Sequence, residues 1–286
     1  MERSYNKDHI YLRTTDHERT FNSAESLIDG LYPPAFRNSS KTEVIDIDTI
    51  EQETDNLYPT NNCPKLNTLC ANEEKTPAWL QVLSRYEKLY KEFEKVWNVE
   101  EIPDWFVLFG AFESMVAHKI PLPQGVTKEM VEEVHNVSAL QMGLLYGNTS
   151  IATLGIGRFI YDFREALLLS INNRSSIRFA LYSAHDVTVG LILNLLDLYS
   201  QAAYWPPFAS HIVFEYWQEN SGNLFVKIYY NGNELFLPGC PRPCPLSYFI
   251  AILNRYALLN DQWKKLCQVP RKQRYSSIDP VVDFLC

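Results

Sequence analysis

The sequence of 286 residues predicts an α/β fold in which a mainly helical region interrupts a sheet. A strand-like run at residues 9–14 passes directly into a helical pattern, residues 76–172 keep helical spacing, and a second strand, turn and helix follow residue 173. We therefore expect four parts. These are the N-terminal part of an α/β core (1–75), a mainly helical cap region (76–172), the C-terminal part of the core (173–267) and a tail (268–286).

The first helix is expected directly after the first strand. Residues 15–18, Thr-Asp-His-Glu, have the form of a capping box, in which a Thr at the helix start and a Glu three residues later cap each other's backbone. Apolar residues follow at helical spacing: Phe21, Ala24, Leu27, Ile28 and Leu31. Residues 32–34, Tyr-Pro-Pro, end the helix. Arg13 is thereby predicted to end a strand just before a helix.

Residues 41–55 carry six acids among isolated aliphatic residues, without a glycine turn: Glu43, Asp46, Asp48, Glu51, Glu53 and Asp55. This pattern predicts a solvated strand and loop with the acids at the surface, rather than a metal site. Three helices are expected next. Thr76 and Pro77 begin the first, whose apolar face continues to Val96; Thr127 caps the second; residues 156–167 mark the third.

The C-terminal third returns to sheet patterns. Residues 177–182 read as a strand and 187–199 as a helix, followed by hairpin signals around strands at 211–217, 224–230 and 234–237. The basic residues 264–274 predict a mobile tail. The longest stretch free of charges and strong breakers, at 187–196, is about half of the ~20 residues that a membrane span needs, so no membrane span is expected.

The net charge of −8 and pI of about 5.3 disfavour nucleic acid as a partner. Six cysteines and four N-x-S/T sequons indicate an oxidising secretory lumen, although the chain does not open with a signal sequence. The cysteines are Cys63, Cys70, Cys240, Cys244, Cys267 and Cys286, and the sequons start at Asn38, Asn136, Asn148 and Asn173. Cys240 and Cys244 have no second ligand pair at zinc spacing, so a disulfide is favoured over a metal site. Spacing alone leaves fifteen pairings open.

Two strand-to-helix junctions carry residues suited to phosphate chemistry, one with Arg13 and one with His185 and Asp186. In open α/β sheets, ligands bind beyond the carboxyl ends of strands, where helix N-termini favour anions. The planar guanidinium group of arginine can form two parallel hydrogen bonds to phosphate. Histidine can donate a hydrogen bond to phosphate or attack phosphorus as a nucleophile, and aspartate can protonate a leaving oxygen. The structural alternatives are a surface ion pair for Arg13, a hydrogen-bonded polar histidine, and a plain helix cap for Asp186.

Three sequence blocks are more specific than this chemistry. Residues 11–34 begin Tyr-Leu-Arg-Thr-Thr-Asp, continue with Arg19-Thr20 and end in Tyr-Pro-Pro; residues 181–188 read Leu-Tyr-Ser-Ala-His-Asp-x-Thr; residues 237–246 read Leu-Pro-Gly-Cys-x-x-x-Cys-Pro-Leu. They resemble, in order, the second block, the His-Asp motif and the C-terminal cysteine block of histidine acid phosphatases of the prostatic and lysosomal type.

The resemblance implies a phosphoglycerate-mutase-like core with a helical cap, and hydrolysis of phosphomonoesters through a phosphohistidine without metal or other cofactor. It implies phosphate binding by Arg13 and His185 and general acid catalysis by Asp186. It selects two disulfides, Cys63 with Cys267 and Cys240 with Cys244, and leaves Cys70 and Cys286 unassigned. Homodimerisation and a lysosomal or extracellular location are further expectations from the family.

One departure from the family matters most. The nucleophile lies in an R-H-G-x-R-x-P block that closes the first strand, and none of the six histidines here follows an arginine and precedes a glycine. We therefore expect a family member whose sequence begins after that block; the alternative is a pseudophosphatase that binds phosphate without turnover. Because the block contributes a strand at the middle of the parallel sheet, its absence predicts two unpaired strand edges and poor folding.

Overall fold

The computed structural model describes residues 5–33, 45–59, 62–202 and 205–268. The strands are β1 (Ile10–Thr15), β2 (Asp48–Ile50), β3 (Phe179–Ser183), β4 (Ile212–Gln218), β5 (Leu224–Tyr230), β6 (Asn233–Leu235) and β7 (Cys244–Pro245). The α-helices are α1 (Glu18–Leu31), α2 (Pro64–Glu73), α3 (Pro77–Arg85), α4 (Glu87–Trp97), α5 (Trp105–Ala117), α6 (Lys128–Gly147), α7 (Thr149–Ile171), α8 (Asp186–Leu195), α9 (Tyr199–Ala202), α10 (Leu246–Tyr256) and α11 (Asn260–Leu266), and a 3₁₀ turn, η1 (Lys7–His9), precedes β1.

A parallel sheet with the order β2-β1-β3 carries both junctions predicted from the sequence. β1 leads into α1 and β3 leads into α8, so the N-termini of both helices lie at the carboxyl edge of this sheet. In the register between β1 and β3, Arg13 lies opposite Tyr182 and Thr14 opposite Ser183. The expectation of two unpaired edges is therefore wrong for β1 and β3, which form a ladder with each other.

A second sheet is antiparallel, with the order β4-β5-β6 and with β7 also paired to β5. These strands confirm the predicted hairpins. The turns use left-handed residues, Gly222 between β4 and β5 and then Asn231 and Gly232 between β5 and β6, which is why asparagine and glycine marked them in the sequence.

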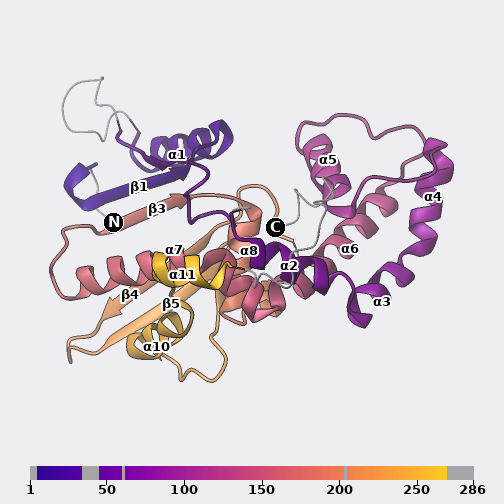
Figure 1. The fold of residues 1–286 in the computed structure, drawn as a ribbon. Coiled ribbons are helices and arrows are strands. Elements are labelled where there is room, and N and C mark those ends of the chain that lie inside the picture. Colours follow the sequence, from indigo (N-terminus) through magenta and orange to yellow (C-terminus); the bar gives the residue numbers. More distant parts are fainter. Residues whose placement is uncertain (1–4, 34–44, 60–61, 203–204, 269–286) are drawn as a thin grey trace.

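Helices α3 to α6 form the cap, on the opposite side of the molecule from α1 and β1 (Figure 1). Thr76 and Thr127 cap α3 and α6 as predicted, each accepting a backbone N–H three residues on. The single helix expected up to Val96 is instead two, because the backbone leaves helical geometry at Tyr86. The helix expected over 187–199 is also divided, with Asp197 in the left-handed region between α8 and α9.

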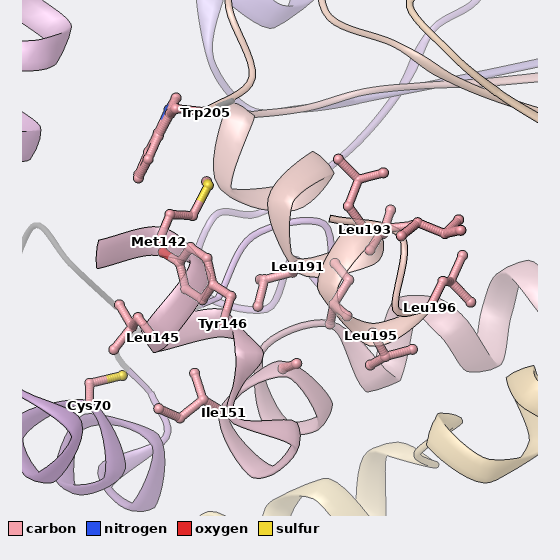
Figure 2. Close-up of a cluster of buried hydrophobic side chains, with 14 of the residues drawn as sticks. Cys70, Met142, Leu145, Tyr146, Ile151, Leu191, Leu193, Leu195, Leu196 and Trp205 are labelled. Atoms are coloured by element: carbon pink, nitrogen blue, oxygen red, sulfur yellow. The ribbon is translucent and has the colours of Figure 1, made fainter. Parts of the chain in front are cut away.

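The buried apolar side chains form two separate clusters. The large one joins the cap helices, α7, α8, α10 and the antiparallel sheet. Figure 2 shows part of it, where Met142 of α6 lies against α8; a Cβ atom added at Gly190 would approach the Met142 methyl carbon to 2.5 Å. The small cluster lies between β1 and α1, with Tyr5, Leu12, Ile28 and Tyr32 as its buried members.

Both disulfides implied by the resemblance are present. Cys63, before α2, is bonded to Cys267, after α11, over a separation of 204 residues. Cys240 is bonded to Cys244 immediately before α10. Cys70 is also disulfide-bonded, and Cys286 lies outside the described residues.

Two further sequence predictions bear on function. Among the helices in the described ranges, none combines the length and the apolarity that crossing a membrane requires. Nor do His, Cys, Asp and Glu side chains within those ranges gather in a group of three or more suited to a metal ion.

Candidate active site

Arg13 lies near the end of β1 and is buried, with 3% of the residue exposed. Its Nη2 donates to Oδ1 of Asp55 at 2.5 Å and to Oδ1 of Asn56 at 2.7 Å. Asp55 is itself buried, 1% exposed, so the prediction that all six acids of residues 41–55 lie at the surface is wrong for this one. The reason is its distant partner: a buried arginine needs a buried counter-charge.

The acceptors of Arg13 are held in turn by α7. Asn56 Nδ2 donates to Oδ2 of Asp162 at 2.6 Å, and Arg158 donates to the backbone oxygens of Thr54 and Asp55. Burial lowers the pKa of the Arg158 guanidinium, which lies 4.0 Å above the ring of Trp263. The strand that bears Arg13 is thus tied to α7 by hydrogen bonds and charge.

Two atoms of this network are buried without a hydrogen-bond partner among the described residues, Arg13 Nε and Asp55 Oδ2. A buried N–H donor left unpaired costs about 1–3 kcal/mol. Arg13 therefore retains a donor that an acceptor reaching this position would satisfy.

His185, between β3 and α8, is also buried, and both of its ring nitrogens are hydrogen-bonded. Arg19 approaches Nδ1 at 3.1 Å and can only donate, so Nδ1 accepts and the neutral ring carries its proton on Nε2. Nε2–H then donates to Thr15 Oγ1 at 3.0 Å, and the Thr15 hydroxyl donates to Thr20 Oγ1 at 2.9 Å. The Thr20 hydroxyl in turn donates to a backbone oxygen, either that of His17 at 2.8 Å or that of Thr15 at 3.0 Å, and this series of hydrogen bonds ends there.

These contacts correct the expected capping box. Thr15 is the last residue of β1 rather than a helix cap, and α1 begins at Glu18 with His17 in the cap position. The Thr15 hydroxyl instead accepts the hydrogen bond from His185 Nε2. Thr15 and Arg13 are two residues apart on a strand, so their side chains lie on the same face of the sheet.

The surroundings of His185 keep it uncharged. Burial, followed by the positive charge of Arg19 and then of His17, lowers the pKa of His185 to about 4. The rings of His17 and Tyr58 stand edge-on to it, with centroids at 5.1 and 4.8 Å. In the absence of a bound anion, His185 is thus a neutral hydrogen-bonding group above about pH 4.

Asp186 is the first residue of α8, and both of its carboxyl oxygens accept hydrogen bonds. Oδ1 accepts the Val187 backbone N–H at 2.9 Å, and Oδ2 accepts the indole N–H of Trp205 at 2.5 Å. Two tyrosines lie close enough to sense its charge. Burial and then Asp186 raise the pKa of Tyr58 and of Tyr146.

The short segment before α2 links the two junctions. Its residues Asp55 and Asn56 bind Arg13, its Tyr58 packs on His185, and the Leu57 carbonyl accepts the Thr188 hydroxyl at 2.6 Å. Arg13, His185 and Asp186 therefore lie at one edge of one sheet, as the sequence predicts, although each is bonded to other protein groups. Sequence reasoning missed the side-chain partners of these residues: Asp55 and Asn56 for Arg13, Thr15 and Arg19 for His185, and Trp205 for Asp186. Thr15 and Arg19 lie inside the quoted motif, whereas no pattern marked Trp205.

Comparisons with known proteins agree with this geometry. Residues 1–231 match the family model of the histidine phosphatase superfamily, branch 2. The chain is 30% identical over 261 residues to counting factor 60 of Dictyostelium discoideum, covering 90% of this chain and 62% of that protein. It is 28% identical over 295 residues to lysosomal acid phosphatase of Xenopus laevis, covering 94% of this chain and 65% of that protein. The chain thus spans less than two thirds of the length of these two relatives.

Solved structures support the fold. Apo phytase of Hafnia alvei superposes with a TM-score of 0.68 at 16% identity, over 94% of this chain and 82% of that one. The phytase of Klebsiella sp. ASR1 gives a TM-score of 0.67 at 14% identity, over 95% and 83%. The predicted α/β core with a helical cap is confirmed.

Proposed function

Because the chain belongs to branch 2 of the histidine phosphatase superfamily, we propose that it is an acid phosphatase for phosphomonoesters. In this proposal Arg13 and His185 bind the phosphoryl group, and Asp186 protonates the leaving oxygen. One observation carries it: direct pairing of β1 with β3 places all three residues at the carboxyl edge of a single parallel sheet.

The hydrogen bonds of the site suggest how phosphate enters. The unpaired Nε–H of Arg13 is a buried donor available to a phosphate oxygen. His185 Nε2–H donates to a neutral threonine hydroxyl, and a phosphate oxygen is a stronger acceptor for the same proton. Binding an anion also raises the pKa of a histidine, so proton uptake by His185 accompanies binding as the pH falls.

The proposed reaction has two steps. A histidine nitrogen forms a P–N bond while the P–O bond to the alcohol breaks, and the alcohol oxygen takes the proton of the Asp186 carboxyl group. Water then attacks phosphorus, loses a proton to Asp186 and breaks the P–N bond. The nucleophile of the first step is the histidine of the R-H-G block, which these 286 residues do not contain.

Phosphate binding is the first test. Calorimetry should detect inorganic phosphate binding to the 286-residue chain at pH 5. Arg13→Ala should weaken binding at least tenfold, and Arg13→Lys should restore little because lysine lacks the planar fork. The exposed Arg174 provides the control, since Arg174→Ala should leave affinity within twofold. Equal affinity in Arg13→Ala and the parent chain would contradict the assignment.

The role of Asp186 is tested by leaving-group dependence in a form that also carries an R-H-G segment. Asp186→Asn should lose about 10² to 10⁴ in rate on alkyl phosphates, which need protonation of the leaving oxygen. The loss should be much smaller on aryl phosphates with acidic phenols. Equal losses of rate on alkyl and aryl phosphates would show that Asp186 is a structural residue and not the general acid.

A second candidate function is phosphate binding without turnover, which the donors at Arg13 Nε and His185 Nε2 would support by themselves. The two functions differ in one measurement, hydrolysis of p-nitrophenyl phosphate by the chain alone and with an R-H-G segment added before it. Turnover only with the segment supports the phosphatase. Binding without turnover in both forms supports the second function, whereas turnover by the chain alone that His185→Ala abolishes would make His185 the nucleophile.

We also propose maturation in the secretory pathway, toward the lysosome or the exterior. Two disulfides and two relatives named lysosomal or prostatic acid phosphatase support it. Among the sequons, Asn173 is exposed in a left-handed turn, whereas Asn136 lies within α6 and Asn148 caps α7. Asn38 lies outside the described residues. Expression in secretory cells followed by glycopeptide mapping should find Asn173 occupied first.

A further inference from the structure

Trp205 lies between the proposed acid and the cap. Its side chain is buried, 6% exposed, and its indole Nε1–H donates to Asp186 Oδ2 at 2.5 Å. The other carboxyl oxygen of Asp186 accepts the N–H of the next residue, Val187. Among the described residues, the bond from Trp205 is therefore the one that ties the carboxyl group to a different part of the chain.

The cap holds the indole ring. Phe106 and Phe109, both of α5, contact the Trp205 ring with centroid distances of 4.6 and 5.3 Å. Met142 of α6 lies below Trp205 in Figure 2, where it packs against the first turns of α8 near Gly190. Aromatic contacts on a buried ring restrict its orientation, so the direction of the indole N–H follows from the position of α5.

We propose that Trp205 is a positioning residue that fixes the carboxyl group of Asp186 relative to cap helix α5. With only the hydrogen bond from the following backbone N–H, the Asp186 side chain can still change its rotamer. A second hydrogen bond from a donor fixed in space restricts the side chain to a single rotamer. Orientation matters because proton transfer needs the acid within hydrogen-bond reach of the leaving oxygen. The effect of this contact on catalysis rests on the proposed function, whereas the hydrogen bond between Trp205 and Asp186 is independent of it.

Trp205→Phe is the decisive variant, because it removes the N–H donor and keeps an aromatic ring against Phe106 and Phe109. Trp217→Phe is its matched control, since Trp217 is 54% exposed on β4. The measurement is the pair of three-bond couplings from Asp186 Cγ to its own amide nitrogen and carbonyl carbon, recorded by NMR on the full chain without substrate. These couplings report whether the side chain occupies one rotamer or several.

The parent chain and Trp217→Phe should each show a single Asp186 rotamer, and Trp205→Phe should show averaging. A single unchanged rotamer in Trp205→Phe would overturn the proposal. If Trp205→Phe does not fold, Asp186→Ala provides the test, and the chemical shift of the Trp205 indole N–H is measured in it. An upfield shift relative to the parent chain supports the contact, and an unchanged chemical shift overturns the proposal. Failure of phosphate binding would refute the proposed function and leave these results standing.

In a form with turnover, Trp205→Phe should lower kcat on alkyl phosphates about tenfold with KM within twofold.

Discussion

The N-terminal layer, formed by β1, α1 and β2, is held to the molecule differently from the remainder, which we call the main body. The main body shares one large apolar cluster and contains both of the disulfides described above. The N-terminal layer has its own small apolar cluster. It joins the main body through the β1–β3 ladder, the packing of Phe179 and Leu181 of β3 against that small cluster, the Arg13 network and the hydrogen bonds of His185.

This difference places the proposed phosphate site at the boundary of the two regions. Arg13 belongs to the layer and finds its acceptors at Asp55 and Asn56, while His185 belongs to the main body and donates to Thr15 of the layer. Polar contacts are directional and can be exchanged for those of a ligand, whereas apolar packing cannot. Of the contacts that fasten the layer, the hydrogen bond from His185 to Thr15 is the one that phosphate would replace in the proposed site.

Removal of the long-range disulfide should have the largest effect, and it should act on the main body. The Cys63–Cys267 bond closes a separation of 204 residues, for which loop entropy predicts a loss of about 5 kcal/mol in the free energy of unfolding. The Cys240–Cys244 bond spans four residues and predicts about 2 kcal/mol. Paired Cys→Ser substitutions compared by urea denaturation give both values; equal losses would contradict the loop model here.

The buried ion pair should be next, with its effect concentrated in the N-terminal layer. Arg13→Met leaves Asp55 buried without its counter-charge, which costs about 3–5 kcal/mol. Hydrogen exchange should accelerate in β1 and α1 far more than in α6 and α7. Arg13→Met with Asp55→Leu should lose less than the sum of the single variants. A uniform acceleration across the chain would show that the layer and the main body unfold as one unit.

The elements that the sequence predicts well are those marked by a clear local pattern. Strand β1, the hairpins and the caps at Thr76 and Thr127 follow from patterns within a few residues. Helix α5 was not expected, because apolar residues surround it on all sides and leave no periodicity: Trp105, Leu108, Phe109 and Phe112 are buried, and Val107 is exposed. Helix α2 was missed as well, despite Pro64 at its first turn.

The site shows the same limit. Motif and position predict Arg13, His185 and Asp186 as site residues, yet their side-chain partners come from distant parts of the sequence. Asp55 lies 42 residues from Arg13 and looked like one of several surface acids. Trp205 lies 19 residues from Asp186. No local period encodes such contacts, since tertiary packing brings the residues together.

Acidification should loosen the boundary further. His185 has a pKa of about 4 in the folded chain against 6.5 in the unfolded chain, so between these values the unfolded state binds the extra proton. Stability from this group is therefore complete above pH 6.5 and falls by about 3 kcal/mol as the pH drops to 4. His185→Gln should remove that part of the pH dependence in urea titrations at pH 7, 5.5 and 4. The same slope in His185→Gln would assign the effect to other groups.

Two glycines of α7 provide the smallest test, within the main body alone. A Cβ atom added at Gly157 would lie 2.8 Å from the backbone oxygen of Tyr256 and 3.1 Å from the Leu258 side chain. Leu258 N–H already donates to the Gly157 carbonyl, so the two segments cannot separate cheaply. Gly157→Ala should lower the free energy of unfolding by about 1–2 kcal/mol, the cost of overpacking less the gain in helix propensity.

Gly155 is the matched control, because it lies on the same helix and its added Cβ would meet only side-chain atoms, the nearest at 3.2 Å in Leu191. These can shift by a few tenths of an ångström, so the gain in helix propensity should make Gly155→Ala neutral to slightly stabilising. Neither substitution touches the N-terminal layer, and hydrogen exchange in β1 should change no more than exchange in α7. Faster exchange confined to β1 in Gly157→Ala would show that α7 supports the layer through Arg158 and Asp162 more tightly than through its apolar face.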